Sequence, residues 1–280
     1  MKKLFVAGIA AVALCSASVF AADMPVKAPV YKPIAAPPAY SWTGLYVGGS
    51  IGGRWADPVW TTTCLAPMVG APCFDPARLA FNNPASFKST SLRGSIYGGY
   101  NWQLDPMWVV GIESDVGFAR NQRTIADIPG AELAIFAPGD TSTIKESWDA
   151  GIRGRLGYLI NPTVLLFATG GATWTRLEAS AFCGTPFAAG GFCTPGFSFF
   201  GTTSTLSKTL TGWTAGGGIE WMLAPQWLVR GEYRYADYGK LSGTFFPGFN
   251  GAVVNGEAIA AEVKLKTHTV LFGIAYRFGP

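Results

Sequence analysis

The chain has 280 residues and a net charge of +4; 49% of its residues are hydrophobic, 14% are charged and 36 are glycine. The charged fraction is about half that of soluble domains and glycine is about twice as frequent, which excludes a disordered chain, a coiled coil and a nucleic-acid-binding domain. Beyond the first 22 residues, no stretch approaches the roughly 18 consecutive apolar residues of a membrane-spanning helix. The apolar side chains must therefore be accommodated by another kind of structure.

The first 21 residues have the features of a secretory signal peptide. Lys2 and Lys3 precede an apolar run over residues 4–13, and a small-x-small cleavage site ends at Ala21. We expect residues 1–21 to be removed, which leaves 19 basic against 17 acidic side chains and a net charge of +2. A charge this small predicts no nucleic acid or other polyanionic partner.

Residues 22–40 form a separate segment that is rich in proline. Five prolines lie among alanines, valines and two lysines. Proline at this density favours the extended polyproline II conformation and removes backbone hydrogen-bond donors. We interpret residues 22–40 as a semi-rigid periplasmic linker before a single domain over residues 41–280.

Apolar and polar side chains then alternate with a period of two, as expected for strands with two different faces. In residues 43–55, for example, Leu45, Val47 and Ile51 share one face while Ser50 and Arg54 share the other. The same alternation predicts strands over residues 43–55, 91–103, 108–118, 148–160, 164–174, 213–221, 227–235 and 268–278. One segment is ambiguous, because Leu165 and Phe167 fall on the face that is polar elsewhere.

A repeated turn fixes how these strands are connected. Residues 104–108, 160–164 and 223–227 share an apolar-x-Pro-x-apolar pattern, in which proline favours a tight turn. The other connections, near residues 56–90, 121–143, 178–207 and 239–264, are long and polar. Short turns at one end and long loops at the other predict an all-β fold, an eight-stranded antiparallel transmembrane β-barrel with short periplasmic turns and four long extracellular loops.

Aromatic residues mark the two edges of a lipid-facing band. Trp108 and Phe118, like Trp148 and Tyr158, are ten residues apart on one face. Ten residues of tilted strand rise about 25 Å, the height of the apolar band of such barrels. The expected inner girdle is Trp102, Trp108, Tyr158, Trp221, Trp227 and Tyr276, and the expected outer girdle is Trp55, Phe118, Trp148, Trp174 and Trp213. This pattern predicts a cell outer membrane location with outer-membrane lipid as a partner.

The chain also resembles the alphaproteobacterial outer-membrane immunogenic protein family. The resemblance lies in residues 40–49 (YSWTGLYVGG), 98–102 (GGYNW), 212–221 (GWTAGGGIEW) and 276–278 (YRF), and in the prolyl-alanyl segment after the signal. It implies a small porin-like surface antigen with an eight-stranded barrel and a role in envelope integrity. It also implies that Phe278 is the signal for the barrel assembly machinery, although Gly279 and Pro280 follow it here.

The inward-facing positions carry many charges. Seven arginines face five carboxylates in a lumen just wide enough for side chains, where an unpaired charge costs several kcal/mol. The set is Arg54, Arg93, Glu113, Asp115, Asp149, Arg153, Arg155, Glu220, Arg230, Glu232, Arg234 and Arg277. We interpret it as an ion-pair network that plugs the lumen; a continuous water path lined by the same residues is the alternative.

No residue pattern predicts a catalytic site, a cofactor or a metal site. Residues 48–52 fit the G-x-S-x-G pattern but lie in an alternating strand, and Glu113 with Asp115 is more simply explained by the ion network than by acid–base catalysis. His268 is the one histidine; it is expected on the outer face near the outer rim, in contact with lipid head groups.

Four cysteines remain after the signal. Short separations and an oxidising compartment favour disulfides between Cys64 and Cys73 and between Cys183 and Cys193, with zinc binding by the loop thiolates as the alternative.

Three functions remain open. The first is a structural barrel whose loops bind a host or envelope surface partner through phenylalanine-rich tips at Phe197, Phe199, Phe200, Phe245, Phe246 and Phe249. The second is a narrow diffusion porin for small solutes. The third, a soluble ligand-binding barrel, requires apolar residues inside and polar residues outside, the reverse of this pattern.

Overall fold

The structure is a computed structural model that describes residues 40–66, 72–73, 79–80, 82–130, 139–184, 201–247 and 258–279. The expected signal peptide and all but the last residue of the expected linker lie outside these residues. The strands of the described part are β1 (Gly44–Ala66), β2 (Ala85–Ser86), β3 (Ser89–Gln103), β4 (Trp108–Ala126), β5 (Thr141–Asn161), β6 (Val164–Phe182), β7 (Thr203–Ala224), β8 (Trp227–Phe245) and β9 (Ala258–Phe278).

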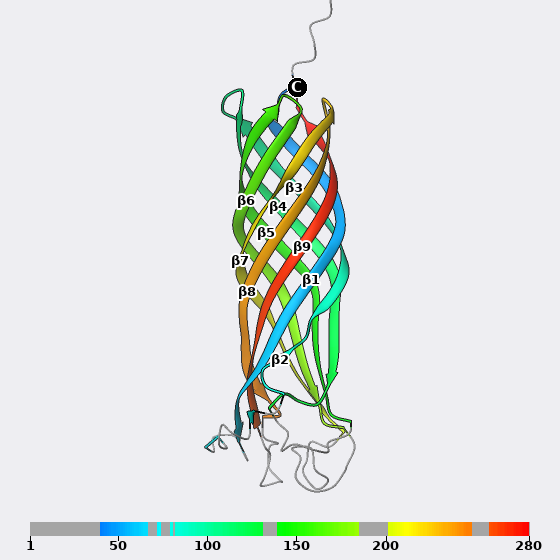
Figure 1. The fold of residues 1–280 in the computed structure, drawn as a ribbon, viewed down its shortest axis with the longest axis vertical. Coiled ribbons are helices and arrows are strands. Elements are labelled where there is room, and N and C mark those ends of the chain that lie inside the picture. Colours follow the sequence, from blue (N-terminus) through cyan, green and yellow to red (C-terminus); the bar gives the residue numbers. More distant parts are fainter. Residues whose placement is uncertain are drawn as a thin grey trace, which may run out of the picture. The chain divides into compact units, whose positions relative to one another are not determined.

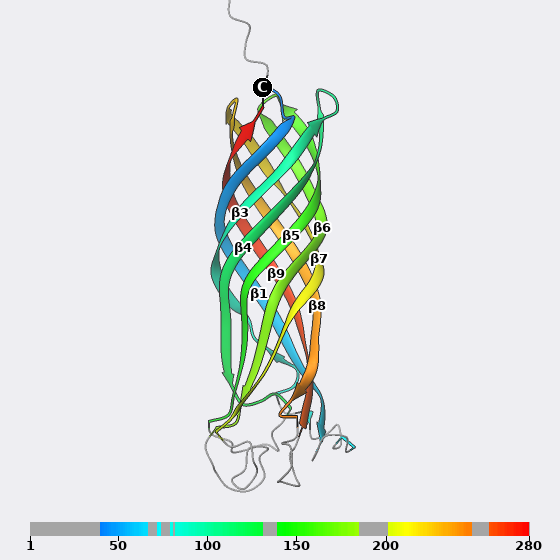
Figure 2. The same ribbon diagram turned by 180° about the vertical axis from the view of Figure 1, so that it is seen from behind.

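Eight of the described strands close into a ring, which confirms the predicted antiparallel barrel (Figures 1 and 2). Each strand from β3 to β9 pairs with the next, β1 pairs with β3, and β9 returns to β1 from Leu45↔Phe278 to Ala66↔Ala258. Among the described strands, the short strand β2 pairs only with β1. In the described residues, no helix is long and apolar enough to cross a membrane.

The three proline turns lie at one end of the ring, as predicted. They join β3 to β4, β5 to β6 and β7 to β8. In the first, Asp105 Oδ1 accepts hydrogen bonds from the backbone N–H groups of Met107 and Trp108 at 2.8 and 2.7 Å. In the second, Asn161 Oδ1 accepts one from Thr163 N at 2.9 Å. Short polar side chains thus hold the backbone of two turns closed. We call this end of the barrel the turn end and the opposite end the loop end.

Towards the loop end the strands run further than the sequence predicted. The alternation predicted strand ends at residues 55 and 118, whereas β1 continues to Ala66 and β4 to Ala126. Likewise β5, β7 and β9 begin before the predicted residues, and β6 and β8 end after them. Much of the predicted long loops is therefore strand. The prediction was wrong there because the apolar residues of these segments change from the outer to the inner face.

This change of face is visible along β9. Phe272 and Ile274 on the outer face are 67% and 50% exposed, whereas Lys264 and Lys266 occupy the outer face nearer the loop end. On the inner face of the loop-end segment lie Val263 and Leu265, both buried. The turn-end half of β9 is therefore apolar outside, and its loop-end segment is apolar inside.

The interior of the barrel consequently has three layers. A turn-end apolar cluster contains Trp42, Tyr46, Tyr97, Val109, Leu159, Leu165, Phe167, Met222, Leu228 and Ala275. A larger loop-end apolar cluster is built on Trp60, Phe87, Ile144 and Phe245 with their buried neighbours. Buried charged side chains lie in the third layer, which the next subsection describes. Two residues of the predicted inner girdle, Trp108 and Tyr158, are cross-strand partners with ring centroids 5.2 Å apart.

Candidate functional site: a charged lumen with apolar ends

Twelve buried charged side chains form one connected network inside the barrel. Six arginines pair with six carboxylates, and every member of the network shares at least one ion pair with another. The members are Arg54, Arg93, Glu113, Asp115, Glu146, Asp149, Arg153, Arg155, Glu220, Arg230, Glu232 and Arg234. Equal numbers of opposite charges make this layer electrically neutral, which a low-dielectric interior requires.

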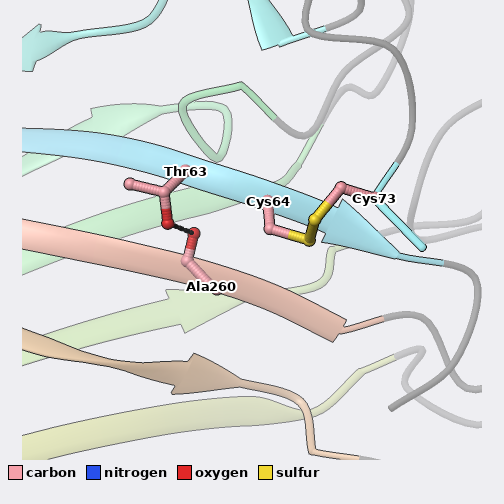
Figure 3. The surroundings of a disulfide bond; sticks show 4 residues. All are labelled: Thr63, Cys64, Cys73 and Ala260. Carbon is pink, nitrogen blue, oxygen red and sulfur yellow. Dashed lines mark hydrogen bonds between the residues drawn. A yellow bond between two sulfur atoms is a disulfide. The ribbon is translucent and has the colours of Figure 1, made fainter. Parts of the chain in front are cut away.

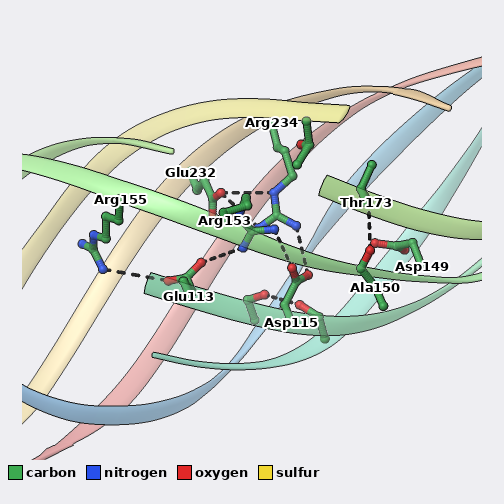
Figure 4. Close-up of polar contacts among 12 residues, drawn as sticks. Glu113, Asp115, Asp149, Ala150, Arg153, Arg155, Thr173, Glu232 and Arg234 are labelled. Atoms are coloured by element: carbon green, nitrogen blue, oxygen red, sulfur yellow. Dashed lines mark hydrogen bonds and ion pairs between the residues drawn. The ribbon is translucent and has the colours of Figure 1, made fainter. Parts of the chain in front are cut away.

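The strand register brings the charges together. Glu113 of β4 and Arg153 of β5 are cross-strand partners, and so are Glu220 of β7 and Arg230 of β8. Arg153 also reaches the next inward position of β4, because its Nη2 lies 2.6 Å from Glu113 Oε1 and its Nη1 lies 2.5 Å from Asp115 Oδ1 (Figure 4). One guanidinium thus bridges two carboxylates on a neighbouring strand.

Two carboxylates act as hubs. Asp115 pairs with Arg93 at 2.6 Å, Arg153 at 2.5 Å and Arg234 at 2.9 Å. Space for Arg93 beside it comes from Gly117, where a Cβ would overlap the guanidinium.

Glu113 is the second hub. It pairs with Arg153, Arg155 and Arg230, and it accepts a hydrogen bond from Tyr46 Oη at 2.9 Å. The arginines of Asp115 come from β3, β5 and β8, and those of Glu113 come from β5 and β8, so each hub ties separate parts of the wall together.

Eleven of the twelve lumen residues predicted from the sequence belong to this network, and Arg277 does not. Its guanidinium instead donates to Pro225 O at 2.8 Å and to Thr43 O at 2.9 Å. Arg277 is the last inward position of β9, beside the turns and away from the carboxylates, so backbone carbonyls are its acceptors. It fastens the segment before β1 to the turn between β7 and β8.

Glu146 is a member that the sequence did not predict. By simple alternation it shares the outward parity of Trp148, but a β-bulge between Glu146 and Asp149 shifts the register and turns it inward. There it pairs with Arg54, whose Nη2 lies 2.8 Å from Glu146 Oε2. Strict alternation carries no signal for a bulge, so the pattern could not have placed this residue.

The turn-end apolar cluster explains the two residues that the alternation left ambiguous. Leu165 and Phe167 point inward and are buried against Trp42 and Tyr46 in the same cluster. Trp42 Nε1 donates to Pro162 O at 3.1 Å, and Trp42 N donates to Gln103 Oε1 at 3.0 Å. Trp42 therefore packs inside the barrel beside two of the turns, a role that the sequence had not suggested.

Aromatic faces join this apolar cluster to the ion network. The Arg155 guanidinium lies 4.2 Å from the centroid of the Phe167 ring, and the Arg230 guanidinium lies 3.6 Å from that of Tyr97. Such cation–π contacts stabilise an arginine on the side where it has no carboxylate. The charged layer is thus covered by rings at its turn-end boundary.

At the loop end, aromatic residues pack inside the barrel as well. Trp60 stacks on Phe245 with centroids 4.6 Å apart and on Phe87 at 6.1 Å. Phe245 and Phe246 are both buried, so the prediction that they form exposed loop tips was wrong. They are inward residues at the end of β8 and just after it. The other four predicted tip residues, Phe197, Phe199, Phe200 and Phe249, lie outside the described residues.

The residues weighed for catalysis are held in structural contacts. Ser50 lies in the middle of β1, and its Oγ is 2.5 Å from Ser95 Oγ on β3. His268 lies on the outer face of β9, as predicted, with Nδ1 2.7 Å from Tyr233 Oη. Within the part of the chain that the structure describes, no group of three or more metal-binding side chains occurs.

One predicted disulfide is confirmed. Cys64, near the end of β1, is bonded to Cys73, with Cα atoms 5.2 Å apart (Figure 3). Cys183 is also disulfide-bonded, and its predicted partner Cys193 lies outside the described residues. At the opposite end, Phe278 is the last residue of β9 and is half exposed on the outer face.

Known proteins resemble this chain over nearly its whole length. The family described as outer membrane protein beta-barrel domain matches residues 7–278. The 31 kDa outer-membrane immunogenic protein of Brucella melitensis is 30% identical, covering 99% of this chain and 100% of that protein. The 25 kDa outer-membrane immunogenic protein of Brucella abortus is 26% identical over 94% and 92% of the two chains. Among solved structures, OprG from Pseudomonas aeruginosa has a TM-score of 0.43 at 10% identity, covering 85% of this chain and 97% of its own.

Proposed function

The chain belongs to the outer membrane protein beta-barrel domain family, and we propose that it is a sealed structural barrel that displays its loop end at the cell surface. It reinforces the outer membrane, conducts no solutes through its lumen and performs no chemistry. Its relatives carry names that describe immunogenic outer-membrane proteins, which supports the role of a surface antigen.

The observation that carries the proposal is the filled lumen. A connected network of six arginines and six carboxylates occupies the charged layer, and apolar clusters lie on its turn-end and loop-end sides. Moving an ion along this path would require it to displace paired charges and then to enter apolar layers without hydration. An eight-stranded barrel leaves little room to avoid these side chains.

We expect the barrel to have three partners, of which two are needed for its insertion into the membrane. The first is outer-membrane lipid, which contacts the lipid-facing band between the two aromatic girdles. The second is the barrel assembly machinery, which inserts the protein after recognising the strand that ends at Phe278. The third is a host or envelope surface partner bound by the loops. Within the described residues the loop end presents Lys240, Lys264 and Lys266 on its outer face.

Bilayer conductance separates this function from that of a narrow diffusion porin. We expect the purified, refolded protein to produce no reproducible current steps after insertion into planar bilayers. A porin of known conductance controls for the assay, and heat-modifiable migration in gels controls for folding. Reproducible nanosiemens-scale openings would show that the lumen conducts and that the porin alternative is correct.

Surface display has its own test. A membrane-impermeant amine reagent applied to intact cells should modify Lys264 and Lys266, which lie on the outer face near the loop end. Peptide mass spectrometry measures the modification. If these lysines react only after the cells are lysed, the loop end does not face the outside.

A further inference from the structure

The barrel wall has a break near its loop end between β3 and β4. These strands pair from Gln103↔Val109 to Arg93↔Ala119, whereas β4 stays paired with β5 as far as Ala126. A β-bulge between Phe118 and Asn121 lies at the point where the β3 pairing ends. Beyond it, side chains bridge the two strands: Ser91 Oγ donates to Asn121 Oδ1 at 2.7 Å, and Asn121 Nδ2 donates to Ser89 O at 3.3 Å.

A cavity of about 1010 Å³ occupies this break. On one side it is bounded by Leu92 and Phe118, each 67% exposed on the outer face at the level of the outer girdle. On the other side it is bounded by Arg120, Gln122 and Lys145, which are exposed and polar. The cavity therefore passes from an apolar, lipid-facing side to a cationic side.

Neither of the two cationic side chains at the cavity, Arg120 and Lys145, has a carboxylate within ion-pair distance among the described residues. Lys145 has Glu178 as its cross-strand partner on β6, yet the two form no ion pair in the described structure. Glu146 lines the cavity too, but its carboxylate is buried and is neutralised by Arg54 at 2.8 Å. The free charge at the cavity is therefore positive.

This pattern matches the chemistry of an amphiphile with an anionic head. Arginine and lysine bind phosphate oxygens through charge-assisted hydrogen bonds, and exposed apolar side chains at a membrane boundary accept acyl chains. Addition of a peptide strand to the free edge of β4 is disfavoured, because Arg120 and Arg123 are charged side chains of the kind that protect sheet edges from pairing.

We propose that this wall cavity binds the phosphate-bearing head of an outer-leaflet amphiphile, with Arg120 and Lys145 contacting the phosphate and the acyl chain lying along Leu92 and Phe118. The site is separate from the plugged lumen and does not depend on whether the lumen conducts. It would couple the barrel to the lipid around it at one defined point of the wall.

The test uses the full refolded protein labelled with ¹⁵N in neutral detergent micelles. Lysophosphatidic acid with a twelve-carbon chain, inorganic phosphate and a neutral twelve-carbon glycoside are titrated separately, and amide shifts of Ser91, Asn121 and Gln122 report binding. The double variant Arg120→Ser with Lys145→Ser removes the proposed head contacts. The matched control, Lys208→Ser with Lys264→Ser, removes the same charge from exposed positions of β7 and β9. Phe118→Ser removes the proposed chain contact.

We expect saturable shifts with lysophosphatidic acid and none with the neutral glycoside. The double variant should bind at least tenfold more weakly, Phe118→Ser should also weaken binding, and the control should bind as the parent protein does. Equal binding of inorganic phosphate and lysophosphatidic acid would overturn the role of the chain. Equal binding of the glycoside would overturn the role of the head, and an absence of saturable shifts in the folded parent protein would overturn the site.

Discussion

Each carboxylate hub of the lumen holds several arginines, so its loss leaves more than one buried charge without a partner. Asp115 pairs with Arg93, Arg153 and Arg234. We expect Asp115→Ala to lower the free energy of unfolding by about 3–5 kcal/mol, the usual cost of breaking a buried ion pair from one side. Urea unfolding of the refolded barrel in detergent measures the change.

The matched control is Glu262→Gln, which removes an exposed ion pair with Lys240 at the loop end. An exposed pair contributes less than about 1 kcal/mol. If the two variants unfolded at the same urea concentration, the network would have no part in holding the barrel together.

We expect Asp140, just before β5, to make the loop end sensitive to pH. Burial raises the pKa of its carboxyl, and the hydrogen bond that Oδ1 accepts from Gly184 N at 2.6 Å opposes this only in part. A raised pKa means that the folded state binds the proton more tightly than the unfolded chain does. The contribution of Asp140 to the stability of the loop end is therefore largest at acid pH and is lost as the pH rises through this pKa.

Asp140→Asn keeps the hydrogen-bond acceptor and removes the titrating charge. We expect the variant to slow amide hydrogen exchange at Gly184 at neutral pH relative to the parent, after correction for the intrinsic exchange rate. The difference should shrink at acid pH, where Asp140 is protonated. A difference of the same size at both pH values would contradict the assignment.

The apolar face of a single strand changes from the outside of the barrel to the inside along its length. A strand such as β9 is apolar outside in its turn-end part and apolar inside in its loop-end part, while its side-chain alternation continues unbroken. A charge placed on the lipid-facing part should therefore cost far more than the same charge near the loop end. We expect Ile274→Arg to lower the free energy of unfolding by about 2–4 kcal/mol, as at the middle of other membrane barrels.

Thr205→Arg, on the exposed loop-end part of β7, is the comparison and should change stability by less than about 0.5 kcal/mol. Refolding into lipid vesicles followed by denaturant titration measures both. Equal costs at the two positions would mean that the lipid boundary does not lie between them.

The disulfide between Cys64 and Cys73 closes a short loop next to the end of β1. In the chain-entropy description, closing a loop of this length raises the free energy of the unfolded state by about 2–3 kcal/mol, because it lowers the conformational entropy of the unfolded chain. Because the bond lies at the loop end, we expect Cys64→Ser with Cys73→Ser to speed protease cleavage near residues 64–73 and to leave the barrel folded. Unfolding of the whole barrel in this variant would show that the bond stabilises more than its own loop.

Features that depend on residues close together in the sequence could be predicted from the sequence. The proline turns predicted three connections, and alternation placed the outward Ile112 and the inward Glu113 correctly. It could not place Glu146, because a β-bulge depends on how two strands pair. It also ended the strands too early, since the rule of apolar residues outside applies only where lipid surrounds the wall. Trp42 was missed because its role depends on turns far away in the sequence.

The described barrel consists of two parts, one after the other along its axis, that differ in which surface is apolar. The turn-end part is arranged for lipid outside and paired charges inside, and the loop-end part is arranged for water outside and an apolar core inside. Inside the barrel, ion pairs fill one layer and apolar side chains pack in the layers beside it.

The most direct test of this account is labelling of the protein in vesicles with a lipid-soluble carbene reagent, mapped by peptide mass spectrometry. We expect labels on Ile51, Ile112, Ile152 and Phe272, which are exposed on the outer face of the lipid-facing band. We expect none on Arg153 or Glu232 in the lumen, or on Val263 and Leu265 inside the loop-end part. Labels on the lumen or loop-end residues, with none on the outward isoleucines, would contradict it.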